Sequence, residues 1–158
     1  MPSRCITLLT FMVLVSPARA QQTERNLDRE KLIWQQLQVL APDAVKTFQR
    51  ATEAMDQGRH EEAVQLYQEV ARKTPGFPPA IRRLGLSLGQ LGKTDEALVL
   101  LELALQKQRS PENLISLARV LAFPVNAKQE SKPVLLRALT LAKEANEKYP
   151  GDDDPSYL

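Results

Sequence analysis

One spacing recurs through the middle of this chain and limits what it can fold into. The members of five residue pairs are each 34 positions apart: Ala51 and Gly85, Gly58 and Gly92, Ala63 and Ala97, Tyr67 and Leu101, and Val70 and Ala104. Small residues stand where two helices must approach closely, large apolar residues follow on the same face, and glycine stands at the turn. A helix pair of this length cannot bury its apolar face alone, so the spacing predicts a stack of such pairs.

Helical periodicity extends over the rest of the chain beyond residue 21, with no strand-like alternation. Proline and glycine interrupt it at short intervals, which predicts short helices joined by tight turns. Seven helices are expected, at about 23–40, 43–57, 60–73, 78–91, 94–108, 111–121 and 131–149, with a polar loop at 123–130 before the last. The predicted fold class is therefore all-α.

The first expected helix has its own apolar stripe, and the sixth has a clear start. At a spacing of three and four, the stripe contains Leu27, Ile33, Trp34, Leu37 and Leu40, and packing is the expected role of Trp34. Ser110, Pro111 and Glu112 provide an N-cap, a proline at the first helical position and an acid in the first turn.

The first twenty residues are expected to be a secretory signal peptide. Arg4 gives a positive start, the run from Cys5 to Val15 carries no charge, and Ala18-Arg19-Ala20 has small residues on either side of one residue, as at a cleavage site. The run is too short to span a bilayer as a helix. The sequence thus predicts export to the periplasm or beyond, with the signal either cleaved or kept as an anchor, and no stable membrane span after cleavage.

Charge and cysteine content exclude several classes of function. The chain has 21 basic and 19 acidic residues, and the signal holds two of the basic ones and no acid, so the remainder has 19 of each. No nucleic-acid partner is expected, because such binding needs a clustered basic surface. The single cysteine, Cys5, lies in the signal, so the mature chain can form neither a disulfide nor a thiolate metal site.

The residues at this spacing resemble the tetratricopeptide repeat family. A first unit, 43–76, has Ala51, Gly58, His60, Ala63, Tyr67 and a closing Pro75; a second, 78–110, has Leu84, Gly85, Gly92, Ala97, Leu101 and Ala104, but Arg109 where proline is usual. A degenerate third unit, 111–150, has Leu117, Ala118, Ala138, Ala142, Ala145 and Pro150, with about eight extra residues in its turn. The resemblance implies a right-handed α-solenoid, which residues 21–42 would open as a capping helix.

No grouping of residues indicates catalysis, a metal or a cofactor. His60 stands at a packing position with no second ligand in sight, and Glu61-Glu62 and Asp95-Glu96 each open a helix, where the helix dipole favours negative charge. The acidic run at 152–154 lacks the remainder of a calcium loop. The chain is therefore expected not to be an enzyme, and an unrecognised active site is the least favoured alternative.

The resemblance implies a protein or peptide partner held in a concave groove lined by the first helix of each unit. Carried over by position, the groove residues are Val45, Phe48, Thr52, Met55, Arg82, Leu86, Gln90, Ile115 and Arg119. Apolar residues with two arginines would suit a peptide with apolar side chains and a carboxylate. The alternative interpretation is that these are ordinary surface or half-buried residues.

The last expected helix has a wider apolar arc than a single neighbouring helix requires. It predicts an uncovered strip at Leu135, Leu139 and Ala142, open to self-association or to another protein. Residues 151–158 are either a tail or the start of a truncated further repeat. The chain is thus either an exported scaffold or the N-terminal repeat region of a larger exported protein whose active domain lies elsewhere.

Overall fold

A computed structural model describes residues 27–124 and 132–150 of the 158-residue chain. In chain order, the helices within these ranges are α1 (Leu27–Leu40), a short 3-10 helix (Pro42–Ala44), α2 (Val45–Asp56), α3 (His60–Lys73), α4 (Pro78–Gln90), α5 (Thr94–Lys107), α6 (Pro111–Ala122) and α7 (Lys132–Lys148). The fold is all-α, as predicted. The expectations for residues 1–20 and 151–158, and most of the predicted loop 123–130, fall outside the described ranges.

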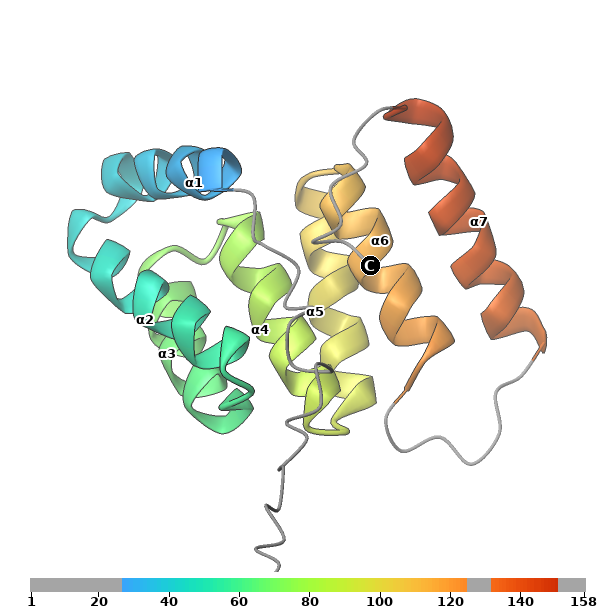
Figure 1. Ribbon diagram of the computed structural model, residues 1–158, viewed down its shortest axis with the longest axis horizontal. Coiled ribbons are helices and arrows are strands. Elements are labelled where there is room, and N and C mark those ends of the chain that lie inside the picture. The colour runs from blue at the N-terminus through green and yellow to red at the C-terminus, as the bar shows by residue number, and fades with distance from the viewer. Residues whose placement is uncertain (1–26, 125–131, 151–158) are drawn as a thin grey trace, which may run out of the picture.

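Three helix hairpins stand side by side in Figure 1, and α1 lies across one end of them. The hairpins are α2–α3, α4–α5 and α6–α7, and α3 and α5 each pack on the first helix of the next hairpin. This arrangement is an α-solenoid of the tetratricopeptide type, because each hairpin buries its apolar face against its neighbours.

The first two hairpins turn in the same way, 34 residues apart. Gly58 and Gly92 have φ angles of 74° and 75°, a left-handed conformation that glycine adopts without the steric cost of a Cβ. Beyond each glycine, one amide closes the helix: Arg59 N donates to Ala54 O at 2.8 Å, and Lys93 N donates to Leu88 O at 3.0 Å. The predicted repeat is thus visible in the backbone hydrogen bonds.

Small residues set the distance between the helices of a hairpin. A Cβ added at Gly85 would lie 3.0 Å from Leu101 Cγ and 3.2 Å from the Ala97 carbonyl oxygen, so α4 and α5 meet too closely there for a side chain. The core runs through all three hairpins, with Phe48, Tyr67, Leu101, Leu114 and Leu117 fully buried.

Polar groups close the junction between α5 and α6. Ser110 Oγ accepts the amide of Asn113 at 3.4 Å, which confirms the predicted N-cap of α6. Buried Asn113 then donates through Nδ2 to the carbonyls of Ala104 and Gln108, at 3.2 and 2.7 Å. The Ala104 carbonyl also accepts the backbone amide of Gln108 at 3.0 Å, so Asn113 adds a second hydrogen bond there and supplies one to the Gln108 carbonyl just beyond the end of α5.

The predicted apolar stripe of α1 was wrong at both ends. Leu27 and Leu40 are exposed, whereas Leu37 is fully buried and Ile33 and Trp34 pack partly on the core. Glu30 is buried in their place. The side of α1 that faces the other helices therefore carries a buried acid, Glu30, because it pairs with the buried Arg83 of α4.

Candidate partner-binding face

An ion pair between α1 and α4 is buried in the protein. The carboxylate of Glu30 contacts the guanidinium of Arg83, and their side chains are only 4% and 3% exposed. Charged groups are seldom buried this deeply unless they are paired, because removing them from water is costly. The position of α1 is thus fixed by a charge on the helix array.

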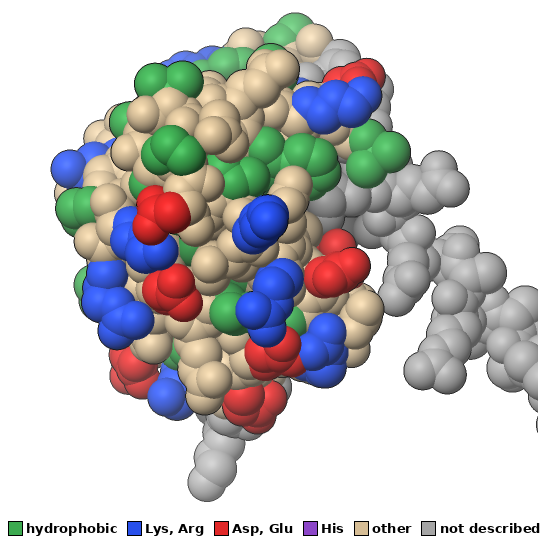
Figure 2. All heavy atoms as spheres, turned by 90° about the vertical axis from the view of Figure 1, so that its left-hand side faces the viewer, with side chains coloured by type: hydrophobic (Ala, Val, Ile, Leu, Met, Phe, Trp, Pro, Cys, Tyr) green, Lys and Arg blue, Asp and Glu red, His purple; other side chains and the backbone are tan. Residues whose placement is uncertain are grey.

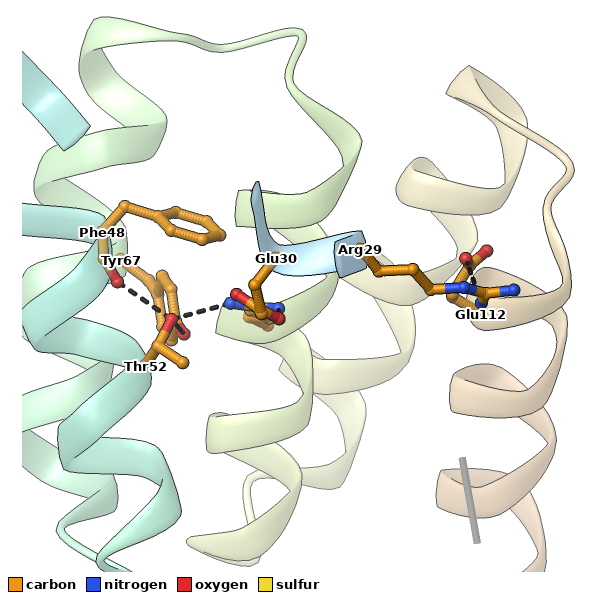
Figure 3. A network of polar contacts seen from close by, with 7 residues as sticks. Arg29, Glu30, Phe48, Thr52, Tyr67 and Glu112 are labelled. Atoms are coloured by element: carbon orange, nitrogen blue, oxygen red, sulfur yellow. Dashed lines mark hydrogen bonds and ion pairs between the residues drawn. The ribbon is translucent and has the colours of Figure 1, made fainter. Parts of the chain in front are cut away.

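A hydroxyl pair from the first hairpin completes the surroundings of Arg83. Arg83 Nη1 donates to Thr52 Oγ1 at 2.7 Å, and Thr52 Oγ1 lies 2.9 Å from the hydroxyl oxygen of Tyr67 (Figure 3). Thr52 also donates to the carbonyl of Phe48 at 3.0 Å. A hydroxyl offers one donor and two acceptors, so Thr52 uses its full capacity if Tyr67 donates to it.

The ring of Phe48 forms another wall of this cluster. Arg83 Cζ lies 4.8 Å from the ring centroid, within the range of a cation–π contact. Phe48 in turn meets Tyr67 and Phe77 edge to face, with centroids 5.5 and 6.2 Å away. We call Glu30, Phe48, Thr52, Tyr67 and Arg83 the arginine cluster.

The two neighbouring arginines of α4 respond differently to burial. Burial by itself would lower the pKa of Arg83, but the Tyr67 hydroxyl and the Glu30 carboxylate raise that pKa above its ordinary value. Burial, together with the charge of Arg83, lowers the pKa of Arg82 to about 10. Arg82 still carries a positive charge at neutral pH, and no ion pair joins it to another residue of the described ranges.

Two adjacent residues of α1 reach in opposite directions. Arg29 Nη1 lies 2.9 Å from Glu112 Oε1 on α6, whereas Glu30 points to the arginine cluster between α2 and α4 (Figure 3). The carboxyl of Glu112 is half-buried; its pKa is lowered although desolvation opposes this, because Ser110, Arg82 and Arg29 favour the charged form. Through these contacts α1 is joined to α4 and α6, and it also packs on α2.

The residues predicted to line a groove differ in exposure. Phe48, Thr52 and Leu86 are buried, Gln90 is exposed, and the rest are half-buried: Val45, Met55, Arg82, Ile115 and Arg119. Phe48 and Thr52 lie within the arginine cluster, so neither is open to a partner while α1 is in place.

Arg119 is the second predicted arginine of this face, on α6. Its Nε is buried without a hydrogen-bond partner, and burial lowers its pKa. Within the described residues no acidic side chain pairs with it. Arg82 and Arg119 are therefore half-buried cations without a carboxylate in contact.

Sequence reasoning did not select Glu30, Tyr67 and Arg83 as a cluster. A signal for Glu30 was present, since it precedes Trp34 and Leu37 by four and seven positions and so shares their side of α1. The choice between Arg82 and Arg83 had no such signal. Their directions on α4 differ by about 100°, which places one toward α1 and α2 and the other toward α6.

The last hairpin leaves leucines in solvent on its outer helix. On α7, Ala138, Leu141 and Ala145 are buried, while Leu135 and Leu139 are 40% and 50% exposed and Ala142 is exposed. Two ion pairs at the exposed edge of the hairpin join α7 to earlier parts of the chain: Glu144 with Arg109, and Arg137 with Glu102.

Residues 54–120 match a family model described as tetratricopeptide repeat. The match covers α3, α4, α5 and most of α6, the segment with the two equal glycine turns. Residues 54–120 are thus tetratricopeptide repeats. No curated protein matches the chain. Repeats of this family generally bind other proteins, so the match supports a role in protein–protein interaction.

The described residues contain neither a metal-binding group nor a membrane-spanning helix. Among the described residues, no group of three His, Cys, Asp or Glu side chains is placed to hold a metal ion. No helix within the described ranges is both long and apolar enough to cross a membrane.

Proposed function

We propose that this protein is an exported scaffold, and not an enzyme, that holds a protein partner along the face of α2, α4 and α6. The observation that carries the proposal is the pair of half-buried arginines, Arg82 and Arg119, on neighbouring helices of that face without a carboxylate in contact. Because the half-buried apolar residues Met55 and Ile115 lie on the same face, a peptide with an acidic group and apolar side chains fits this chemistry. Export is supported by Arg4, the apolar run to Val15 and the Ala18–Ala20 site.

Charge reversal tests this proposal. The chain with Arg82→Glu and Arg119→Glu should lose its partner in a pull-down from the cell-envelope fraction, because the two anion-binding groups become repulsive. Arg50→Glu, on an exposed position of α2, is the matched control and should retain the partner. Far-UV circular dichroism checks that each variant is folded. Full retention of the partner by the folded double variant would refute the role of this face.

A second surface is proposed at α7, on the strength of its exposed leucines. Leu135, Leu136 and Leu139 lie within about one helical turn of one another, and apolar side chains grouped in this way mark contact sites. Replacing Leu135 and Leu139 with serine should abolish binding of an apolar dye and any self-association seen by light scattering, while stability changes by about 0.5 kcal/mol or less. If the unaltered chain stays monomeric at high concentration and binds no dye, the α7 surface is not a contact site.

A further inference from the structure

The helix α1 is thinly held compared with the array on which it lies. Of its 14 residues only Glu30 and Leu37 are buried, whereas nine of the 13 residues of α4 are buried. Its outer side leaves Leu32 58% and Val39 84% exposed. Figure 2, which views the left-hand side of Figure 1, shows hydrophobic side chains gathered in the upper part of that face and mixed charges below. Since few apolar contacts hold α1, the arginine cluster contributes much of its attachment.

The array side of the cluster is complete without α1. Arg83 is held by Thr52 and by the ring of Phe48, both on α2, and Tyr67 on α3 supports Thr52. Only the anion comes from α1, since Glu30 is the acidic partner of Arg83 within the described ranges. A buried guanidinium without a counter-charge is strongly unfavourable. Any segment that replaces α1 must therefore bring an acidic group to Arg83.

The inner face of α1 shows what else such a segment needs. Glu30, Trp34 and Leu37 follow one another at four and three positions on the side that meets the array. This is the spacing by which an amphipathic helix lies in a groove of a partner protein. The connection to α2 is short: only Ala41, with φ −155° and ψ 85°, separates α1 from the 3-10 helix. Rotations at this extended residue would swing α1 away without unfolding α2.

We propose that α1 is an intramolecular occupant of the α2–α4–α6 face, and that an amphipathic helix of a protein partner takes its place there. The partner helix carries a carboxylate that pairs with Arg83 and large apolar side chains four and seven positions later, in the places of Trp34 and Leu37. This inference rests on the proposed function of the same face. It adds the chemistry of the partner and identifies α1 as the segment that keeps the partner out. Because α1 is tethered, its effective concentration is about millimolar, so it excludes weak ligands.

The single tryptophan of the chain, Trp34, reports whether α1 is in place. The probe is a synthetic peptide of residues 27–41 with Trp34→Phe, so that all tryptophan fluorescence comes from the full-length chain. Glu30→Gln in the chain removes the internal carboxylate but keeps the shape of the side chain. Asp28→Asn is the matched control, since Asp28 is an exposed acid on the same helix and its ion pair with Lys31, at 3.0 Å, lies on the surface of α1.

In the Glu30→Gln chain, the peptide should displace α1 and shift Trp34 emission to the red. This should occur at concentrations about tenfold or more below those needed for the Asp28→Asn chain, because only the former lacks a carboxylate at Arg83. A second peptide carries Glu30→Gln in addition to Trp34→Phe. It should bind the Glu30→Gln chain at least about tenfold more weakly than the first peptide does, because it brings no carboxylate to Arg83. If circular dichroism shows that the Glu30→Gln chain is unfolded, the Glu30→Asp chain is used in its place. Aspartate keeps the negative charge but is too short to reach Arg83 as closely.

Three results would overturn the proposal. Trp34 emission could remain unchanged at saturating peptide, the two peptides could bind equally well, or the unaltered chain could form dimers that exchange α1, which would assign the face to a second copy of the chain. None of these results depends on Arg119 or on a cellular partner. Loss of the partner in the Arg82→Glu and Arg119→Glu chain would stand even if the α1 peptide failed to bind, so the two proposals fail separately.

Discussion

The two ends of the helical array are attached in different ways. At one end, α1 is positioned by a buried ion pair and leaves only two of its residues buried. At the other end, α7 packs Ala138, Leu141 and Ala145 against α6 and places its ion pairs at the exposed rim. A buried charge pair depends on the identity of its partners, whereas small apolar contacts depend on shape. The attachment of α1 is therefore sensitive to the identity of the two paired residues, whereas the attachment of α7 tolerates substitutions that keep the shape of its apolar contacts.

The largest effect is expected from Arg83→Ala. It removes the guanidinium that pairs with buried Glu30 and one of the hydrogen-bond partners of Thr52, so the free energy of unfolding should fall by about 3–5 kcal/mol. Urea denaturation followed by circular dichroism measures this. Glu30→Leu combined with Arg83→Met should recover most of the loss, because neither charge is then buried. If the double variant is no more stable than Arg83→Ala, the attachment of α1 is not electrostatic.

A smaller loss is expected at the other end from Leu141→Ala. Leu141 is 7% exposed on the inner side of α7, and its truncation should lower the free energy of unfolding by about 2–3 kcal/mol, near the low end for buried leucines. Leu136→Ala, at a half-exposed position on the same helix, is the control and should change little. A larger loss for Leu141→Ala than for Arg83→Ala would reverse the comparison between the two ends.

The smallest effect concerns pH at the rim of α7. Hydrogen bonds from Arg109 and Lys148 lower the pKa of Glu144 to about 2 from the ordinary 4.5. A pKa that is lower in the folded state stabilises the protein above about pH 4.5, and this contribution is lost as the pH falls through about 2. The melting temperature of Glu144→Gln should therefore be slightly below that of the unaltered chain near pH 6, and the difference should vanish near pH 2. A pH-independent difference would mean that Glu144 acts through packing alone.

The repeat was predictable because its signals are local in the sequence. Glycine at 58 and 92 encodes the turn, and small residues at 63, 85 and 97 encode the close approach of the two helices of a hairpin. The position of α1 was not predictable in this way. Its decisive contact joins residues 53 positions apart, and nothing in a single sequence says which of 19 acids pairs with which arginine.

The candidate site was predictable only in outline. Position in the repeat selected Phe48 and Thr52, which do belong to the arginine cluster, but it gave no reason to expect them under another helix. It also selected Arg82 and passed over Arg83. Burial of a charge depends on what covers it, and that is a property of the tertiary structure.

The adjacent contacts of Arg29 and Glu30 have a consequence for how the chain unfolds. In an array where each hairpin touches only its neighbours, stability is a sum of local terms, and one end can open while the other stays folded. Here one helix bonds to α4 and α6 at once, and the bond from Arg29 to Glu112 spans 83 residues. Such a contact of high sequence separation couples the second hairpin to the third through α1, so opening α1 weakens the array. The protein should therefore melt as one cooperative unit with α1 docked, and in separate steps once it is released.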